Sequence, residues 1–341
     1  MKVMIAGIGG ASLGTELLKA LKMKGGYIIY GCDISPVAYG MYQKEFQKTY
    51  RVDNDDYITE VIKACSDCGA QWIIPGGEKP MILLGQAKAR LKENGIELVS
   101  NNTNVINIFS NKEKTFQILK EKNISIPKTK AVTVFSDLND IEFPCIVKPS
   151  TDSGGSAMVF FALDAQEAMI YAEYIQRIGI VPIVQEYIDE SEGEFTIGVL
   201  SWTDGSIAGS IALKRSLEAK LSIMMRSRGG VISSGYSQGY IDDFSEFRRQ
   251  AEDIAKAVGS TGPINVQGRV KNGALIPFEI NPRFSASSYL RAMAGFNEVD
   301  FYLQHLKTGS KDASYQIQPG WYLRTLSENY ISPEQYNEKA R

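Results

Sequence analysis

The stretch INVQGRVKNGALIPFEINPRFSASS, residues 264–288, concentrates polar and charged side chains on one face of a predicted β-hairpin. Glu279 and Asn281 are two positions apart in an extended segment, so both side chains point to the same face of the sheet. Their oxygens suit Mg²⁺, which takes one or two hard oxygen ligands from a protein when phosphates and water supply the rest. Arg283 follows in a position to bind a phosphate oxygen. A strand that places these groups on one face buries little apolar area, which favours a metal and phosphate site over a purely structural strand.

The register of this hairpin decides whether Gln267 joins the two ligands. A two-residue turn at positions 272–273 pairs Gln267 with Phe278. A three-residue loop pairs Gln267 with Glu279 instead. The sequence leaves both registers open.

A second segment, PCIVKPSTDSGGSAM at residues 144–158, joins an apolar strand to a polar loop rich in glycine and serine. Backbone amides and hydroxyls in such a loop can surround phosphates, and the charge of Lys148 would neutralise them. The segment is not a P-loop, because no Gly-Lys-Ser/Thr sequence opens a helix. A surface loop after an edge strand is the alternative.

A third segment, VPIVQEYIDESEGEF at residues 181–195, ends an apolar strand in polar residues. The backbone of residues 185–188 can pair with the edge of an adenine, and Glu194 can accept hydrogen bonds from ribose hydroxyls. The alternative is a strand followed by a solvated acidic turn.

The N-terminal segment MIAGIGGASLGTELLKAL, residues 4–21, resembles half of a dinucleotide site. Its glycines follow the spacing GxGGxxxG, one residue longer than the dinucleotide pattern, and Asp33 stands where the ribose-binding acid is expected. An NAD-dependent oxidoreductase is therefore one interpretation, but it leaves the 264–288 hairpin unexplained. Asp33 and Glu78 both follow strands of the predicted first sheet, where ligands collect in open α/β folds, so both are candidate substrate contacts.

Composition bounds the remaining choices. A chain of 341 residues is longer than a single hydrophobic core usually accommodates, so two or three domains are expected. The formal charge of -2 attracts neither nucleic acid nor anionic lipid, and no apolar run is long enough to span a bilayer. We expect a cytoplasmic enzyme without a nucleic-acid or membrane partner. Strands and helices alternate over the first hundred residues, which predicts a parallel sheet with covering helices.

Taken in this order, the segments at 144–158, 181–195 and 264–288 resemble the ATP-grasp superfamily, and within it the synthetase units of the carbamoyl-phosphate synthetase large chain. The resemblance implies an α/β and α+β fold with a Rossmann-like parallel sheet before a two-lobed ATP-grasp domain. It implies a pre-ATP-grasp domain over 1–108 and a small lobe with the phosphate loop over 109–190. The large lobe, with the metal site and a C-terminal extension, covers 191–341.

The resemblance also implies roles for individual residues. The implied ATP-binding residues are Lys112, Lys148, Gly154, Gly155, Ser156, Gln185, Glu186, Tyr187, Ile188, Glu194 and Gln267. Gln267, Glu279 and Asn281 are the implied ligands of two Mg²⁺ ions, with Mn²⁺ as an alternative metal. Arg283, Lys148 and Arg228 are the implied catalytic residues. Arg226 and Arg228 in MMRSRGG, residues 224–230, are candidate substrate anchors.

The chain holds one grasp unit, whereas the synthetase holds two, and single-unit relatives mostly join a carboxylate to an amine. The resemblance therefore implies a ligase that forms an acyl phosphate from ATP and a small carboxylate, couples it to an amine, and releases ADP and phosphate. Phosphorylation of a carboxylate or carbamate, as in the synthetase, is one alternative, and a non-catalytic nucleotide-binding protein is another. A homodimer is common in the family and is one expected assembly.

Overall fold

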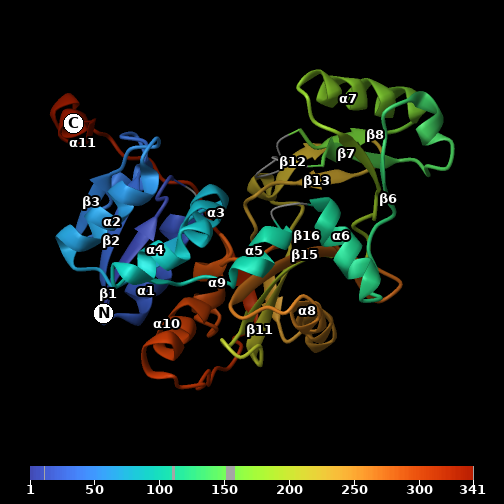
Figure 1. The fold of residues 1–341 in the computed structure, drawn as a ribbon. Helices are drawn as coiled ribbons and strands as arrows, with labels where there is room; N and C mark the ends of the chain where they lie inside the picture. Colours follow the sequence, from blue (N-terminus) through green and yellow to red (C-terminus); the bar gives the residue numbers. More distant parts are fainter. Residues whose placement is uncertain (11, 110–111, 151–157, 341) are drawn as a thin grey trace.

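The computed structural model describes the chain except for residues 11, 110–111, 151–157 and 341, and the side chains of residues 112 and 113 are also outside the description. Three sheets of four or more strands organise the described residues, beside one two-stranded sheet (Figure 1). The first lies at one side of the molecule, a small second sheet lies at the other, and the largest sheet lies between and below them.

The first sheet is parallel throughout, with strand order β3-β2-β1-β4-β5. Its strands are β1 (Lys2–Ala6), β2 (Ile28–Asp33), β3 (Lys48–Arg51), β4 (Trp72–Pro75) and β5 (Glu97–Leu98). The helices of this region are α1 (Leu13–Lys24), α2 (Tyr57–Cys68), α3 (Glu78–Gln86) and α4 (Lys88–Glu93), with a 3₁₀ turn, η1 (Tyr39–Tyr42). Apolar runs such as Val3–Ala6 are fully buried because helices cover the parallel sheet.

The second sheet is antiparallel, with strand order β6-β9-β7-β8. Its elements are β6 (Thr129–Ala131), η2 (Phe135–Leu138), β7 (Cys145–Pro149), β8 (Phe160–Ala162), α7 (Ala165–Arg177) and β9 (Pro182–Glu186). The α7 helix begins where the carboxylate of Asp164 accepts the amides of Gln166 and Glu167, both at 2.9 Å, as an N-cap does.

The largest sheet is antiparallel, with strand order β16-β15-β10-β11-β14-β17. Its strands are β10 (Glu194–Ser201), β11 (Ile207–Arg215), β14 (Gly239–Asp242), β15 (Pro263–Lys271), β16 (Ala274–Asn281) and β17 (Gly320–Tyr322). A separate hairpin follows η3 (Lys220–Ser222) and consists of β12 (Ile223–Arg226) and β13 (Val231–Ser233). The remaining helices are α5 (Thr103–Phe109), α6 (Lys112–Glu121), α8 (Ser245–Ala257), α9 (Ser288–Met293), α10 (Glu298–Thr308) and α11 (Pro333–Ala340).

These sheets confirm the predicted fold class, a parallel α/β sheet followed by antiparallel α+β lobes. The predicted lobe boundaries cut across two cores. Phe116 and Leu119 of α6 lie in the core formed by α8 and the largest sheet, although the boundary at 109 places α6 with the small lobe. The reason is hydrophobic: the apolar side of α6 covers the sheet that contains β10 and β15.

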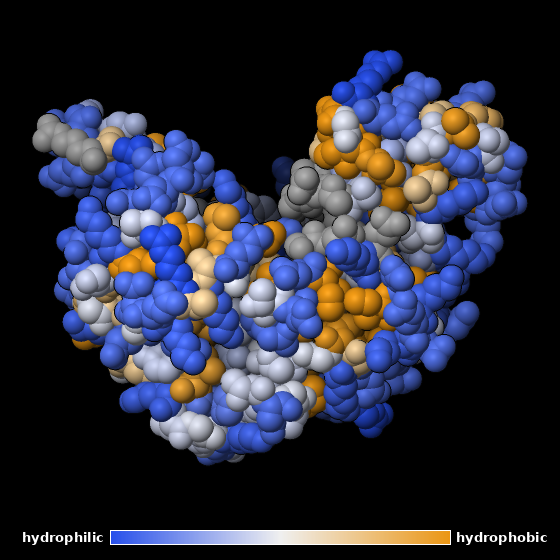
Figure 2. Space-filling model, in the orientation of Figure 1, coloured by the Kyte–Doolittle hydropathy of each residue, from blue (hydrophilic) through white to orange (hydrophobic). Residues whose placement is uncertain are grey.

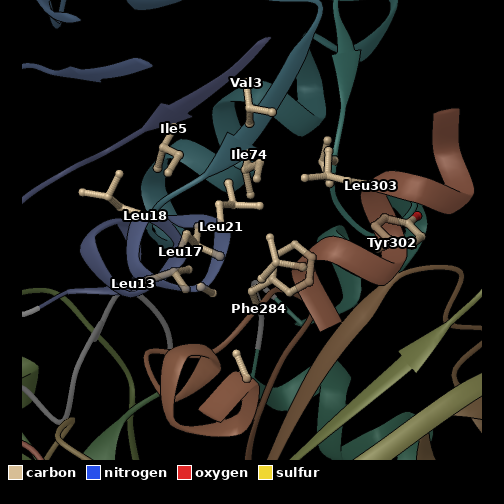
Figure 3. Close-up of a cluster of buried hydrophobic side chains, with 14 of the residues drawn as sticks. Val3, Ile5, Leu13, Leu17, Leu18, Leu21, Ile74, Phe284, Tyr302 and Leu303 are labelled. Atoms are coloured by element: carbon tan, nitrogen blue, oxygen red, sulfur yellow. The ribbon is translucent and has the colours of Figure 1, made fainter. Parts of the chain in front are cut away.

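The second shared core joins α1 of the first domain to residues 284–303, which are far from it in the sequence (Figure 3). Leu17 and Leu21 of α1 belong to the same buried cluster as Phe284, Tyr302 and Leu303. Polar contacts reinforce it: the side chain of Asn297 donates to the carbonyl of Ala20 at 2.9 Å. The helices α9 and α10 therefore anchor the first domain to the large lobe. Among the described residues, no helix is long and apolar enough to cross a membrane.

Candidate nucleotide and metal site

One face of the largest sheet carries the polar groups of the candidate site. In antiparallel register, Gln267 of β15 lies opposite both Glu279 of β16 and Thr196 of β10. Asn281 lies opposite Asn265 in the same way. Directly paired residues share a face, so these side chains form a row across three neighbouring strands. The pairing brings together all three residues expected to bind metal.

The hairpin has the two-residue turn of one predicted alternative and the Gln267–Glu279 pairing of the other. The turn has two residues, Asn272 and Gly273, both with positive φ as a type I′ turn requires. That turn alone would pair Gln267 with Phe278, but the register shifts by one residue between Gln267 and Gly268. The shift is a β-bulge at Phe278, and it places Glu279 opposite Gln267, where Gln267 Nε2 donates to Glu279 Oε2 at 2.8 Å.

A pocket lies between this sheet and the small lobe. Its lining comes from β7, β9, β10, β13, β15 and β16 and from the segments that adjoin them. The lining residues are Pro127, Ile146, Lys148, Val159, Gln185, Glu186, Tyr187, Ile188, Glu194, Val231, Ile232, Ser233, Arg269, Phe278 and Glu279. The space-filling view shows a broad notch between the first domain and the small lobe (Figure 2). Apolar side chains along the pocket and a few polar groups at its floor are typical of a site for a planar organic ligand.

Lys148 lines this pocket and is buried, with 6% of its surface exposed. Its ammonium donates to Gln185 Oε1 at 2.9 Å and lies 5.6 Å from the ring centroid of Phe116. Gln185 in turn donates to Thr129 Oγ1 at 3.0 Å. The structure therefore places a buried cation beside the predicted adenine strand.

The end of β9 is fixed by neighbouring strands. Burial raises the pKa of Glu186, but ion pairing with Lys271 at 2.6 Å and a hydrogen bond from the Lys128 amide outweigh burial and leave that pKa lowered. Tyr187 OH accepts the Val231 amide at 2.8 Å and donates to Glu190 at 2.5 Å. The side chains at 186 and 187 are thus held by protein partners while the pocket remains open beside them.

Glu194 lines the pocket as expected, but its carboxylate is fully buried between two arginines. Its oxygens lie 3.1 Å from Arg215 Nη1 and 2.9 Å from Arg269 Nε. A ribose hydroxyl can bind this carboxylate only by sharing it with both guanidiniums. Sequence reasoning missed Arg215 and Arg269, because each comes from a different strand and only the register brings them to Glu194.

Arg283 lies just beyond β16 and has an unusual environment for a guanidinium. Its Nη1 donates to the carbonyl of Phe284 at 2.9 Å, and its buried Nε has no partner among the described residues. Burial lowers the pKa of Arg283, although the charges of Glu279 and Glu78 oppose this shift. Glu78, at the start of α3 in the first domain, also lines a smaller pocket with Glu279 and Asn281. The structure therefore brings Glu78 to the site.

The other first-domain candidate, Asp33, has a structural role. Its Oδ2 accepts the amide of Ile8 at 2.7 Å and its Oδ1 accepts the amide of Ser35 at 2.9 Å. The carbonyl of Ile8 accepts the amide of Gly40 at 2.9 Å. A dinucleotide enzyme would present this carboxylate to a ribose, but here the carboxylate binds backbone amides, including one of the glycine loop. This disfavours the oxidoreductase interpretation.

The remaining predicted residues divide into two groups. Arg226 and Arg228 lie on the exposed end of the β12–β13 hairpin, where Arg226 Nη2 donates to the carbonyl of Leu217 at 2.9 Å. Neither arginine lines the pocket, although three residues of β13 do. The residues Gly154, Gly155 and Ser156 and the side chain of Lys112 lie outside the described part of the chain.

The donor set fits Mg²⁺ held jointly with phosphates. Among the described residues, no group of three His, Cys, Asp or Glu side chains is arranged to hold a metal ion. Glu279 supplies one carboxylate, and Gln267 and Asn281 supply amide oxygens. Asn281 is buried and its Nδ2 has no partner among the described residues, so the amide can turn its oxygen toward an ion without breaking a described bond from that nitrogen. Mg²⁺ commonly binds through one or two carboxylates plus substrate phosphates, so this set suits a metal that arrives with a nucleotide.

Known proteins share both the sequence and the fold. The large chain of carbamoyl phosphate synthase from Thermoanaerobacter sp. (strain X514) is 29% identical over 231 residues, which cover 61% of this chain and 20% of that protein. The same protein from Saccharolobus solfataricus is 27% identical over 220 residues, covering 62% and 20%. The chain thus spans about a fifth of the length of these relatives.

Solved structures extend the likeness over most of the chain. An L-amino acid ligase from Bacillus licheniformis superposes with a TM-score of 0.66 at 15% identity, covering 89% of this chain and 73% of that one. The N5-carboxyaminoimidazole synthetase of Staphylococcus aureus complexed with ADP gives 0.67 at 15% identity, covering 93% and 80%. At this identity the likeness shows the fold alone.

A family model described as an ATP-grasp domain matches residues 109–287. The match takes in the small lobe, the pocket and the hairpin with Gln267, Glu279 and Asn281, and it ends just beyond Arg283. It covers just over half of the chain, which therefore belongs to the ATP-grasp family.

Proposed function

We propose that this chain is an ATP-dependent ligase that activates a small carboxylate and couples it to an amine. In the first step the γ-phosphoryl group of ATP passes to a carboxylate oxygen, giving an acyl phosphate and ADP. In the second step the amine attacks the acyl carbon, the bond to the phosphate oxygen breaks, and the amine loses a proton. The single observation that carries the proposal is the shared face of β15 and β16, where Gln267, Glu279 and Asn281 meet beside Lys148 and Arg283.

The residues of the pocket supply binding and charge neutralisation. The backbone of residues 185–188 borders the pocket at the end of β9 and pairs with the adenine, so ATP is preferred over GTP. Lys148 neutralises phosphate charge, aided by Lys112 and the loop that contains Gly154, Gly155 and Ser156. Gln267, Glu279 and Asn281 hold two Mg²⁺ ions, for which Mn²⁺ can substitute. The metal supplies charge stabilisation to the transferred phosphoryl group. Arg283 steadies that group.

This chemistry needs positioning more than proton transfer. A carboxylate is a poor electrophile, and hydroxide is a poor leaving group, so phosphorylation solves both problems before the amine attacks. Phosphoryl transfer depends mainly on alignment and on neutralising charge. Glu78, Arg226 and Arg228 are substrate contacts in this proposal, with Glu78 the one that borders Glu279. The protein acts in the cytoplasm on small molecules, without nucleic acid or membrane, and as a homodimer.

The test is a screen for ADP release over pairs of carboxylates and amines, with Mg²⁺ and ATP. A productive pair gives ADP and phosphate in equal amounts and a new carbon–nitrogen bond in the product. ADP release that depends on a carboxylate but yields no coupled product would contradict the ligase assignment.

A second candidate is phosphorylation of a carboxylate or carbamate without coupling to an amine. The sequence relatives favour it, since they are carbamoyl phosphate synthase large chains. Formation of ATP from ADP and carbamoyl phosphate, at a rate above that from acetyl phosphate, would distinguish this reaction from the ligase.

A further inference from the structure

Arg324 lies in the C-terminal segment, beyond the part of the chain that the family model matches. Its Nη2 donates to the carbonyl of Ala286 at 2.7 Å, and its backbone amide donates to Gln238 Oε1 at 3.2 Å. Ala286 is three residues after Arg283, in the turn between β16 and α9. The segment after β17 therefore delivers a guanidinium to the same turn that carries Arg283.

The charge of Arg324 is poorly compensated. Its side chain is 10% exposed, and among the described residues the one carboxylate within 4 Å is Glu16 of α1, at 3.5 Å. Glu16 also pairs with Lys19, at the shorter distance of 2.8 Å. The Nε of Arg324 is buried and has no partner within the described chain. A guanidinium stays protonated in proteins, so it cannot relieve this imbalance by losing a proton.

Arg283 has the same imbalance on the other side of this turn. Within the described chain it forms no ion pair within 4 Å, and its buried Nε is also unpaired. Arg283 and Arg324 donate to carbonyls only two residues apart, those of Phe284 and Ala286. Buried charges are normally paired, but the two guanidiniums at this turn share one ion pair, that of Arg324 with Glu16, among the described residues.

We propose that Arg324 binds the carboxylate of the substrate, next to the phosphoryl group held by Arg283. The inference rests on the proposed ligase function and assigns the substrate end of the cleft to the seam between α1, the turn at 283–286 and the C-terminal segment. A guanidinium presents parallel N–H donors that match the two oxygens of a carboxylate. Arg324 Nη2 donates to Ala286 and to Glu16, and Nε has no partner among the described residues, so a carboxylate that displaces Glu16 meets Nε–H and one N–H of Nη2 side by side. Glu16 competes for the same charge and keeps the site from holding anions tightly.

The test uses acetate, the simplest stable carboxylate, and the melting temperature of the full chain saturated with Mg-ADP. Acetate is compared with chloride at equal ionic strength. The wild-type protein should gain stability with acetate beyond chloride, and Arg324→Met should weaken the apparent acetate affinity by about tenfold. Glu16→Gln removes the competing carboxylate and should tighten acetate binding. Arg90→Ala, which removes an exposed arginine that bonds Thr59 far from this turn, is the matched control and should leave acetate binding unchanged.

A merely structural Glu16–Arg324 ion pair predicts a different pattern. In that case Arg324→Met and Glu16→Gln lower the melting temperature alike, and neither changes the response to acetate. Absence of an acetate effect in the wild-type protein would also overturn the proposal. If Arg324→Met does not fold, Glu16→Gln and Arg324→Lys decide: unchanged or weaker acetate binding in Glu16→Gln overturns the site, as does full acetate affinity in Arg324→Lys.

The proposed ligase function and the proposed role of Arg324 can fail independently of each other. If acetate binds through Arg324 but no carboxylate and amine pair releases ADP, the anion site stands and the ligase assignment falls. If ADP release occurs and Arg324→Met leaves the KM for the carboxylate unchanged, the ligase assignment stands and the role of Arg324 falls.

Discussion

The glycine loop of the first domain and the bulged hairpin of the large sheet use their polar groups in opposite ways. In the loop, the amides of Gly7 and Ile8 donate to the carbonyl of Cys32 and the carboxylate of Asp33. In the hairpin, polar side chains converge on one face, and the Nδ2 of Asn281 has no partner in the part of the chain that the structure describes. Buried polar groups are nearly always paired, so a ligand site is better marked by the unsatisfied hairpin than by the satisfied loop.

The glycines of the loop permit close packing. A Cβ at Gly14 or Gly76 would lie 2.0 or 1.9 Å from the carbonyl oxygen of Gly7. One at Gly9 would meet, among the described residues, only Ser12 Oγ, at 3.9 Å. Close approach of the neighbouring backbone therefore requires glycine at positions 14 and 76. The same does not hold for Gly9, the glycine that a dinucleotide site would need. A glycine pattern can thus indicate backbone crowding as readily as phosphate binding.

The largest effect is expected at the hairpin. Glu279→Gln keeps the shape of the side chain and removes its charge, so magnesium-dependent ADP release should fall on the order of 1000-fold, about 4 kcal/mol. The melting temperature should hardly change, because Glu279 is only half-buried beside a solvated cleft. Parent-rate turnover in a normally folded variant would remove Glu279 from the metal site. Asp253→Asn, on exposed α8, is a matched control that should retain full activity.

The next effect is expected at Lys148. Lys148→Met keeps the length of the side chain and removes its charge, so affinity for ATP should weaken by about 10- to 100-fold, the loss of one charge-assisted hydrogen bond. Calorimetric titration of ATP measures this directly. Unchanged affinity would make Lys148 a structural lysine, and Lys130→Met on the exposed strand β6 should bind ATP normally.

The loop should respond in stability and leave nucleotide binding unchanged. Gly76→Ala forces a methyl group against the Gly7 carbonyl and should cost about 1–3 kcal/mol of unfolding free energy. Gly76 lies between β4 and α3, against the glycine loop, whereas Gly9→Ala lies within that loop and should cost less than about 0.5 kcal/mol. Chemical denaturation measures both, with ATP affinity as the second readout. A loss of ATP affinity in Gly9→Ala without loss of stability would reverse the comparison and make the loop a nucleotide site.

The smallest effect is expected at Asp33. Asp33→Asn turns an N–H donor toward one of the two amides that the carboxylate accepts, which should cost about 1 kcal/mol. Denaturation of the purified variant measures the cost, and ADP release should stay at the parent rate. A fall in activity at unchanged stability would restore Asp33 as a substrate contact.

Much of this arrangement was predictable from local pattern. The alternation of apolar segments predicts the parallel first sheet, and the two-residue spacing of Glu279 and Asn281 predicts their common face. The β-bulge at Phe278 was not predictable, because a bulge leaves no reliable mark in residue type. The enclosure of Glu194 by Arg215 and Arg269 and the packing of α6 on the largest sheet depend on contacts between distant segments, which periodicity cannot encode.

The core that joins α1 to α9 and α10 bears on how such a chain can be recombined. Leu17 and Leu21 pack with Phe284 and Leu303 in one buried cluster. The first domain and the helices α9 and α10 therefore share one core, and their sequences must match each other. A chimera that exchanges only residues 1–108 for those of a relative would put two unmatched apolar surfaces together. We expect productive crossovers to transfer the first domain and the segment from α9 onward as a pair, leaving the catalytic lobes between them intact.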